Sequence, residues 1–297
     1  MPSILRRAGA AFCACAAVVL MASPADAAVA TPMTASNGHH TDVVGVERGA
    51  AVRQHTAGQT ASFLDAHAAL LGRPLAGHVA ATTIHPAAGT AFIDKGNDQG
   101  AFATQSAHTD VHPTNGGTTI YTPTLYSAGG SCIEVTTVYT NTTQAVEAWD
   151  WCNHINFEAS VAINSSFVSR YENGAGSYTT EILKTGGNTW VAYLYNYSTK
   201  AYDTLYTSSG TSQAGTTGWD VNELYSDLQS NGQSYACADM AGKTFEANGI
   251  QVDLGGTWQA AAPGNSDTRF DSGNASYDCS SRSYQMVTQY NHWKVVG

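Results

Sequence analysis

The feature that most constrains the fold is a regular alternation of short strand-like segments and glycine-rich turns after residue 115. Apolar side chains recur at every second position in these segments, which is the period of a β-strand. Helical periodicity is almost absent there, so we predict an all-β fold, an antiparallel β-sandwich of the concanavalin-like or jelly-roll type over residues 115–297. The segments include SCIEVTTVYT, QAVEAWDWC, WVAYLYNYS and WDVNELYS, and the turns include SAGG, ENGAGS and KTGGN.

Composition changes sharply at the same place. Residues 28–114 contain no Tyr, Trp or Cys but hold 8 of the 10 histidines, whereas the remainder holds all 15 tyrosines and all 6 tryptophans. Only TASFLDAHAALLGR has helical period, with Thr60 as N-cap and Gly72 at its end. We predict that residues 28–114 are a weakly structured, His-rich pro-segment; a linker is the alternative.

The first 27 residues have the pattern of a secretory signal peptide. Two arginines precede a short apolar run, and Ala25-Asp26-Ala27 forms a small-x-small cleavage signal. The apolar run is too short for a stable membrane anchor, and no later run approaches the ~18 residues needed to span a bilayer. We therefore expect a secreted, extracellular protein.

Four cysteines follow the signal peptide and lack C-x-x-C spacing, which favours two disulfides over a metal site. Three pairings are compatible with the sequence. We favour the one that closes the shorter loops, Cys132 with Cys152 and Cys237 with Cys279.

Charge limits the partners. Residues 115–297 contain 7 Lys or Arg against 16 Asp or Glu, a balance of −9, with no basic cluster. Nucleic acid and anionic membranes are poor partners for such a surface. We expect a monomer that uses neither a metal nor another cofactor.

A carboxylate interrupts an apolar row in TTGWDVNELYSDL. Trp219, Val221, Glu223 and Tyr225 fall on one face of this predicted strand. Burying a carboxylate costs several kcal/mol unless it is paired or protonated, so the position either lies at a sheet edge or serves chemistry.

The segment QAVEAWDWC repeats this arrangement, because Glu147 shares a face with Trp149 and Trp151. Two carboxylates in a partly desolvated cleft share a proton, as an acid hydrolase requires. We predict that Glu147 and Glu223 are catalytic and lie on adjacent strands of the concave face. The predicted substrate-binding residues are Trp149, Trp151, Trp219 and Tyr225.

The segment GWDVNELYSDL, followed by ACADMAGKTFEANGIQV, resembles the region of fungal glutamic peptidases (eqolisins) that carries the catalytic glutamate; the matching residue is Glu223. AVEAWDW resembles their first catalytic strand, where eqolisins have glutamine and neprosin-type peptidases glutamate; the matching residue is Glu147. The frame needs a one-residue deletion after Ala148. The resemblance covers about residues 130–255.

This resemblance implies a secreted, acid-acting glutamic endopeptidase made as a zymogen. Glu223 would take a proton from the attacking water, and protonated Glu147 would donate a hydrogen bond to the developing oxyanion. His67, on the apolar side of the predicted helix, would trigger release of the pro-segment when it is protonated in acid, because protonation of a buried histidine is costly.

Other interpretations of these residues remain open. A secreted, lectin-like carbohydrate-binding sandwich would use the tyrosine row of Tyr193, Tyr195 and Tyr197, although such a row can equally be core. Glu147 and Glu223 could themselves be surface residues. Glu134 and Glu158 face away from their apolar neighbours, so we expect both to be solvated.

Overall fold

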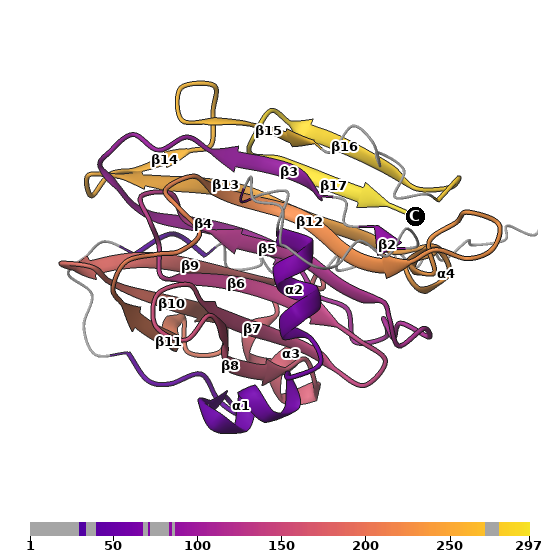
Figure 1. Cartoon of the computed structure of the whole chain (residues 1–297). Coiled ribbons are helices and arrows are strands. Elements are labelled where there is room, and N and C mark those ends of the chain that lie inside the picture. Colours follow the sequence, from indigo (N-terminus) through magenta and orange to yellow (C-terminus); the bar gives the residue numbers. More distant parts are fainter. Residues whose placement is uncertain (1–29, 34–39, 68–70, 72–82, 85–86, 271–278) are drawn as a thin grey trace, which may run out of the picture.

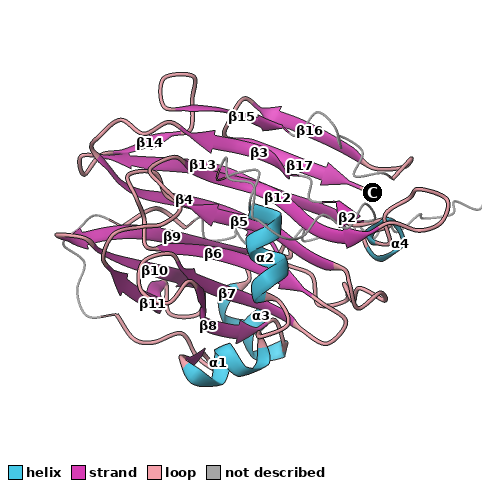
Figure 2. Cartoon of the chain, in the orientation of Figure 1, coloured by secondary structure: helices cyan, strands magenta, loops and turns pink. Residues whose placement is uncertain are grey.

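The computed structural model describes residues 30–33, 40–67, 71, 83–84, 87–270 and 279–297. These residues form two antiparallel β-sheets that stack face to face, with short helices at the periphery (Figures 1 and 2). The predicted all-β sandwich is confirmed. No helix in these ranges is both long enough and apolar enough to cross a membrane.

Sheet 1 carries the glutamates Glu134, Glu147 and Glu223. In spatial order it contains β1 (Glu47–Arg48), β8 (Asn156–Ala162), β7 (Gln144–Asp150), β6 (Ile133–Tyr139), β5 (Thr119–Tyr126), β12 (Gly218–Asp227), β3 (Ala87–Phe92) and β15 (Ser266–Phe270). The short strand β2 (Thr83–Ile84) also pairs with β12.

Sheet 2 lies behind it. Its order is β11 (Ala201–Ser209), β10 (Thr189–Asn196), β9 (Ser177–Gly186), β4 (Asp98–Ser106), β13 (Thr244–Leu254), β17 (His292–Val296) and β16 (Ser283–Thr288), and β14 (Trp258–Ala260) pairs with β13. The helices are α1 (Ala50–His55), α2 (Thr60–His67), α3 (Ser165–Tyr171) and α4 (Ala236–Asp239).

The central strands of sheet 1 are buried on both faces. In β6, Ile133, Val135 and Tyr139 point into the core between the sheets. Val138 points the other way, into a second apolar cluster with Phe63 and Ala66 of α2. Figure 1 shows α2 lying across this outer face of sheet 1. The outer face of sheet 1 is therefore a covered surface, and a polar residue on it is enclosed.

The predicted start of the sandwich at residue 115 is wrong. Strand β3 lies between β12 and β15 in sheet 1, and β4 lies between β9 and β13 in sheet 2. Both strands consist largely of small residues, AAGTAF and DQGAFATQS. Small side chains are needed there, because a Cβ on Gly100 would come within 2.8 Å of the backbone oxygen of Ile182. A removable pro-segment would have to end before Ala87.

Both disulfides have the pairing that the loop lengths favoured. Cys132–Cys152 joins the start of β6 to the turn after β7, and Cys237–Cys279 joins α4 to the segment before β16.

Residues 40–67 run along the edge of the sandwich and then over sheet 1. Asp42 forms a parallel bridge with Thr204, and β1 extends sheet 1 beside β8. Arg53 of α1 donates two hydrogen bonds, of 2.5 and 2.7 Å, to the carboxylate of Glu158. Glu158 is only 3% exposed, so the expectation that it is solvated is wrong. Residues 40–67 are thus docked by polar contacts as well as by apolar side chains of α1 and α2.

Arg53→Ala should destabilise the full chain by about 1–3 kcal/mol, because it leaves the buried Glu158 carboxylate without its donor. Urea unfolding followed by tryptophan fluorescence measures this change. Lys243→Ala is the matched control: its partner Asp110 is 66% exposed, and such surface pairs contribute about 0–1 kcal/mol. Equal losses in the two variants would contradict a structural role for the Arg53–Glu158 pair.

Candidate active site

One row of side chains crosses sheet 1 and brings the site together. Strand register places Trp219 beside Tyr126, Tyr126 beside Glu134, Glu134 beside Trp149, and Trp149 beside Phe157. Directly paired residues of antiparallel strands point to the same face. Glu134 therefore stands in an aromatic row on the face that α2 covers.

Glu134 is fully buried and accepts hydrogen bonds on both oxygens. Thr124 Oγ1 donates to Oε1 at 2.5 Å, and Trp219 Nε1 donates to Oε1 at 2.8 Å. Trp151 Nε1 donates to Oε2 at 2.9 Å. These donors take the place of water around the carboxylate, which is what allows it to be buried here.

Glu223 of β12 lies beside Glu134 but in a different environment. It is also fully buried, and neither oxygen accepts a hydrogen bond within the described part of the chain. Burial raises the pKa of Glu223 to about 8; the charge of Glu134 adds to the rise, and His67 opposes it. The site thus combines one hydrogen-bonded carboxylate with one that favours its protonated form.

His67, from the last turn of α2, lies between the two carboxylates. Its Nε2 is 2.8 Å from Oε1 of Glu134 and 3.1 Å from Oε2 of Glu223, and its Nδ1 is 2.9 Å from the backbone oxygen of Phe63. Since carboxylate and carbonyl oxygens accept hydrogen bonds, both ring nitrogens donate and the ring is an imidazolium. Burial alone would lower the pKa of His67, but the two carboxylates outweigh it and raise the pKa to about 9.

Aromatic rings enclose this cluster. Phe63 of α2 stacks on Trp149 with ring centroids 4.4 Å apart, and Trp151 and Trp219 each lie 5.8 Å from the His67 ring. The sequence placed Phe63 and His67 on one side of the helix, and both are fully buried. The helix therefore inserts an aromatic residue and a cation into the same site.

The predicted pairing of Glu147 with Glu223 on adjacent strands is wrong. Strand β7, which carries Glu147, is separated from β12 by β6 and β5. Glu147 is buried on the same sheet, where Ser160 donates to its Oε1 at 3.0 Å and Nε2 of His55 lies 3.9 Å away. Burial raises the pKa of Glu147, and the contacts with His55 and Ser160 partly offset the rise. The carboxylate that faces Glu223 across His67 is Glu134.

The predicted substrate-binding residues divide into two groups. Trp149, Trp151 and Trp219 lie around the carboxylates, and two of them hydrogen-bond Glu134. Tyr225 lies further along β12, where it lines a cavity of about 210 Å³ that also contacts Ser62 and Asp65. A role of these four residues in binding substrate remains a prediction.

Glu134 is the functional candidate that sequence reasoning missed. It was expected to be solvated because it faces away from Ile133 and Val135, but that opposite face is also buried. Val138, on the same face of β6, was the one available signal that this face is covered.

His67, Glu134 and Glu223 each offer one ligand atom, and these atoms lie within 4.8 Å of one another, as in a metal site. The neighbouring carboxylates, however, raise the pKa of His67 to about 9, and an Nε2 protonated at neutral pH has no lone pair for a cation. The geometry is that of an ion pair. A metal could bind only after His67 loses that proton.

No family model matches the sequence, and no curated protein matches it. Among solved structures, SCP-B, a member of the eqolisin family of peptidases in complex with the tripeptide Ala-Ile-His, is similar over 72% of this chain and 99% of its own, with 12% identity and a TM-score of 0.43. Scytalido-glutamic peptidase bound to a peptide-based transition-state analogue covers the same shares at 12% identity and a TM-score of 0.41. The chain is thus structurally similar, at low identity, to eqolisin-type glutamic peptidases.

Proposed function

We propose that the chain is the zymogen of a secreted, acid-acting glutamic endopeptidase whose reacting pair is Glu134 and Glu223. The observation that carries this proposal is the meeting of two fully buried carboxylates in one aromatic-lined site, bridged by a histidine of the N-terminal segment. Two carboxylates that share a proton can act as base and acid in turn, as hydrolysis of a peptide bond requires.

The position of His67 Nε2 indicates where the nucleophile would bind. That atom lies within hydrogen-bonding distance of Glu134 and 3.1 Å from Glu223. Once α2 leaves, a water molecule in the same place would contact both carboxylates. Glu223 would take the proton of this water, because its oxygens accept no other hydrogen bond among the described residues and keep their lone pairs free. The proton that the pair shares would then lie on Oε2 of Glu134, which accepts a single hydrogen bond, and Glu134 would donate it in a hydrogen bond to the oxyanion.

In this proposal α2 inhibits the enzyme in two ways. Phe63 and His67 fill the space over the pair and exclude substrate. Burial, to which the helix contributes, also raises the pKa of Glu223 to about 8 against the opposing charge of His67, and this keeps the base protonated at neutral pH. Removal of α2 admits water to Glu223, lowers its pKa towards the ordinary value and frees the base.

The test is to incubate the purified chain with denatured casein at pH 3, 5 and 7 and to follow both casein fragments and the loss of the N-terminal segment. Casein cleavage that appears only in acid, together with a shorter chain beginning before Ala87, supports the proposal. An intact chain and intact casein at every pH would contradict it. The lectin-like alternative predicts an intact chain and intact casein at every pH, together with glycan binding.

Substitutions at Glu134 test its role. Glu134→Gln keeps an N–H donor for the oxyanion, whereas Glu134→Ala removes it; loss of one such donor costs about 10²–10³-fold in kcat. We expect the Ala variant to lose activity to this extent and the Gln variant to retain much more. The Gln variant should also remain active at higher pH, because an amide needs no proton to donate. Equal losses in the two variants would show that Glu134 does not act as a donor.

A further inference from the structure

The outer face of sheet 2 is apolar where an exposed sheet face is ordinarily polar. A cluster separate from both other apolar clusters lies there, and it includes residues of β4, β9, β10 and β11: Phe102, Leu183, Val191, Tyr193 and Tyr202. Tyr195, Tyr197 and Trp258 pack at its margin. The tyrosine row of β10 is therefore not part of the core between the sheets. An apolar patch on this scale marks an interaction site when it is uncovered.

Residues 30–33 lie on this patch as a bound peptide would. Tyr202 donates its hydroxyl to the backbone oxygen of Thr31 at 2.7 Å, and Trp258 Nε1 donates to the backbone oxygen of Met33 at 2.6 Å. The backbone N–H of Met33 donates to Oε2 of Glu181 at 2.9 Å. Met33 is 5% exposed and its side chain belongs to the apolar cluster. The face thus recognises main-chain groups in addition to one apolar side chain.

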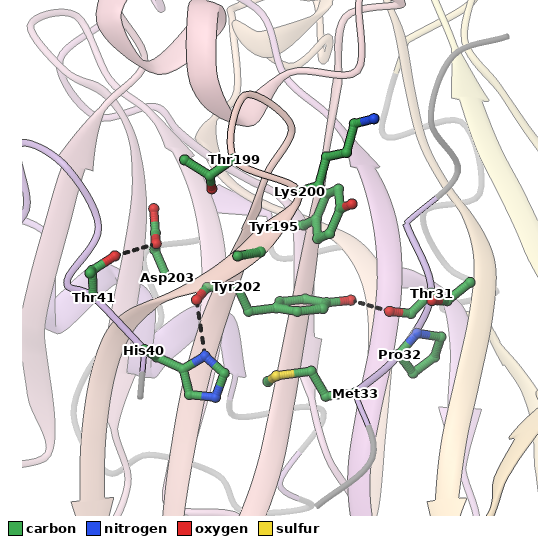
Figure 3. Close-up of a pocket in the computed structure, with 11 residues that line it drawn as sticks. Thr31, Pro32, Met33, His40, Thr41, Tyr195, Thr199, Lys200, Tyr202 and Asp203 are labelled. Atoms are coloured by element: carbon green, nitrogen blue, oxygen red, sulfur yellow. Dashed lines mark hydrogen bonds between the residues drawn. The ribbon is translucent and has the colours of Figure 1, made fainter. Parts of the chain in front are cut away.

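A cavity of about 560 Å³ adjoins this segment. Figure 3 shows the ring of Tyr202 reaching Thr31, with Tyr195 and Met33 on either side of it, and Thr41 bonded to Asp203. Among the described residues, this segment fills only part of the face, and the cavity lies beside it.

Glu181 is the second observation that points to a ligand. It is buried on this outer face, and its Oε1 accepts no hydrogen bond within the described residues, because the nearby hydroxyl of Tyr202 donates to the backbone oxygen of Thr31 instead. Burial raises the pKa of Glu181 to about 8, so at neutral pH it can accept from a backbone N–H through one oxygen and donate through the other. A buried polar group left incompletely bonded costs free energy unless a ligand completes it.

We propose that the outer face of sheet 2, with Glu181, Tyr202 and Trp258 as its polar contacts, is a second binding site for extended polypeptide that residues 30–33 occupy in the zymogen. It binds a main chain through those three residues and one apolar side chain in the place of Met33. Its opening rests on the proposed function, because release of the N-terminal segment uncovers it. The site then holds part of a protein substrate away from the reacting pair.

The test uses the full chain carrying Glu223→Gln, so that no peptide is cleaved and α2 still blocks sheet 1. Met33→Asp is added to displace residues 30–33, and Met33→Ser serves as a milder second variant. A fluorescent peptide of sequence AVATPMTAS, residues 28–36 of this chain, is titrated and followed by anisotropy. The same peptide with Asp in place of Met is the control ligand.

The peptide should bind the Met33→Asp chain at least tenfold more tightly than the chain with Met33, in which the tethered segment competes at roughly millimolar effective concentration. Adding Glu181→Ala or Trp258→Ala should each weaken binding by about tenfold, the loss expected for one hydrogen bond of about 1.4 kcal/mol. The control peptide should not bind.

Two results would overturn the proposal. The first is that adding Glu181→Ala or Trp258→Ala leaves peptide binding unchanged. The second is that the peptide binds neither the Met33→Asp chain nor the Met33→Ser chain. Displacement of the peptide by neutral oligosaccharides would instead assign this face to glycans. None of these outcomes depends on peptidase activity, so the second site and the proposed function can fail separately.

Discussion

Glu223→Gln should abolish both casein cleavage and self-processing. Removing a general base lowers the rate by about 10²–10⁴-fold, and glutamine has nearly the shape of glutamate but cannot take a proton from water. The substitution also removes a buried carboxyl whose pKa burial raises to about 8, so folding should be unaffected or improved. Rates are measured as kcat/KM on a quenched-fluorescence peptide after acid treatment.

Glu147→Gln is the matched control for this prediction. Glu147 is as buried as Glu223 and belongs to the same sheet, but it accepts a hydrogen bond from Ser160 and lies on β7, which β6 and β5 separate from β12, the strand of Glu223. The Glu147→Gln variant should therefore keep its activity. Loss of activity in Glu147→Gln with retention in Glu223→Gln would reverse the assignment.

In the proposed zymogen, His67→Gln should raise the rate of self-processing. It removes the cation between Glu134 and Glu223, and breaking a buried ion pair costs about 3–5 kcal/mol. That loss corresponds to a rise of about 10²–10⁴-fold in the undocked fraction of α2. Self-processing should begin at higher pH and proceed faster, as measured by gel electrophoresis of samples held between pH 4 and pH 8. His55→Gln is the control, because His55 lies 39% exposed and 3.9 Å from its carboxylate.

The sign of the pH effect differs from the one expected from sequence. The pKa of His67 is raised to about 9 in the docked state, against about 6.5 for a free histidine, so its contribution to docking is complete below pH 6.5 and is lost as the pH rises through 9. The expectation that protonation of His67 opens the zymogen is therefore wrong. In the proposed zymogen, acid would have to release the segment through a group other than His67. Slower self-processing in His67→Gln than in the unaltered chain would contradict this role of His67 in docking.

The sequence was sufficient for much of the fold. Two-residue periodicity in segments such as WVAYLYNY and WDVNELYS identified strands β10 and β12, and loop length favoured the two disulfides that the structure contains. It was insufficient for β3 and β4, because segments rich in Ala, Gly and Thr have no apolar alternation. Those residues are small because the backbones of neighbouring strands come close: a Cβ on Gly89 of β3 would overlap the backbone of Asp220 and Val221 of β12.

The site was only partly predictable for a related reason. Periodicity shows which residues share a face, and it correctly grouped Trp219, Val221 and Glu223. It cannot show that both faces of β6 are buried. The face that carries Glu134 is buried by α2, and His67 of that helix precedes Glu134 by 67 residues in the sequence. Partners across strands and helices are set by register and docking, which no single strand encodes.

The most direct test of the central claim is an NMR titration of the His67 imidazole in the full-length chain carrying Glu223→Gln, and again with Glu134→Gln added. The account predicts that His67 stays doubly protonated well above pH 6.5 in the first protein, because Glu134 still holds it. In the second protein, where neither carboxylate remains, its pKa should fall below the ordinary value of about 6.5, since burial, the largest influence, is then opposed only by the hydrogen bond to the Phe63 backbone oxygen. A His67 that titrates at about 6.5 or lower in both proteins would show that it does not occupy the carboxylate pair, and the proposed zymogen would be wrong.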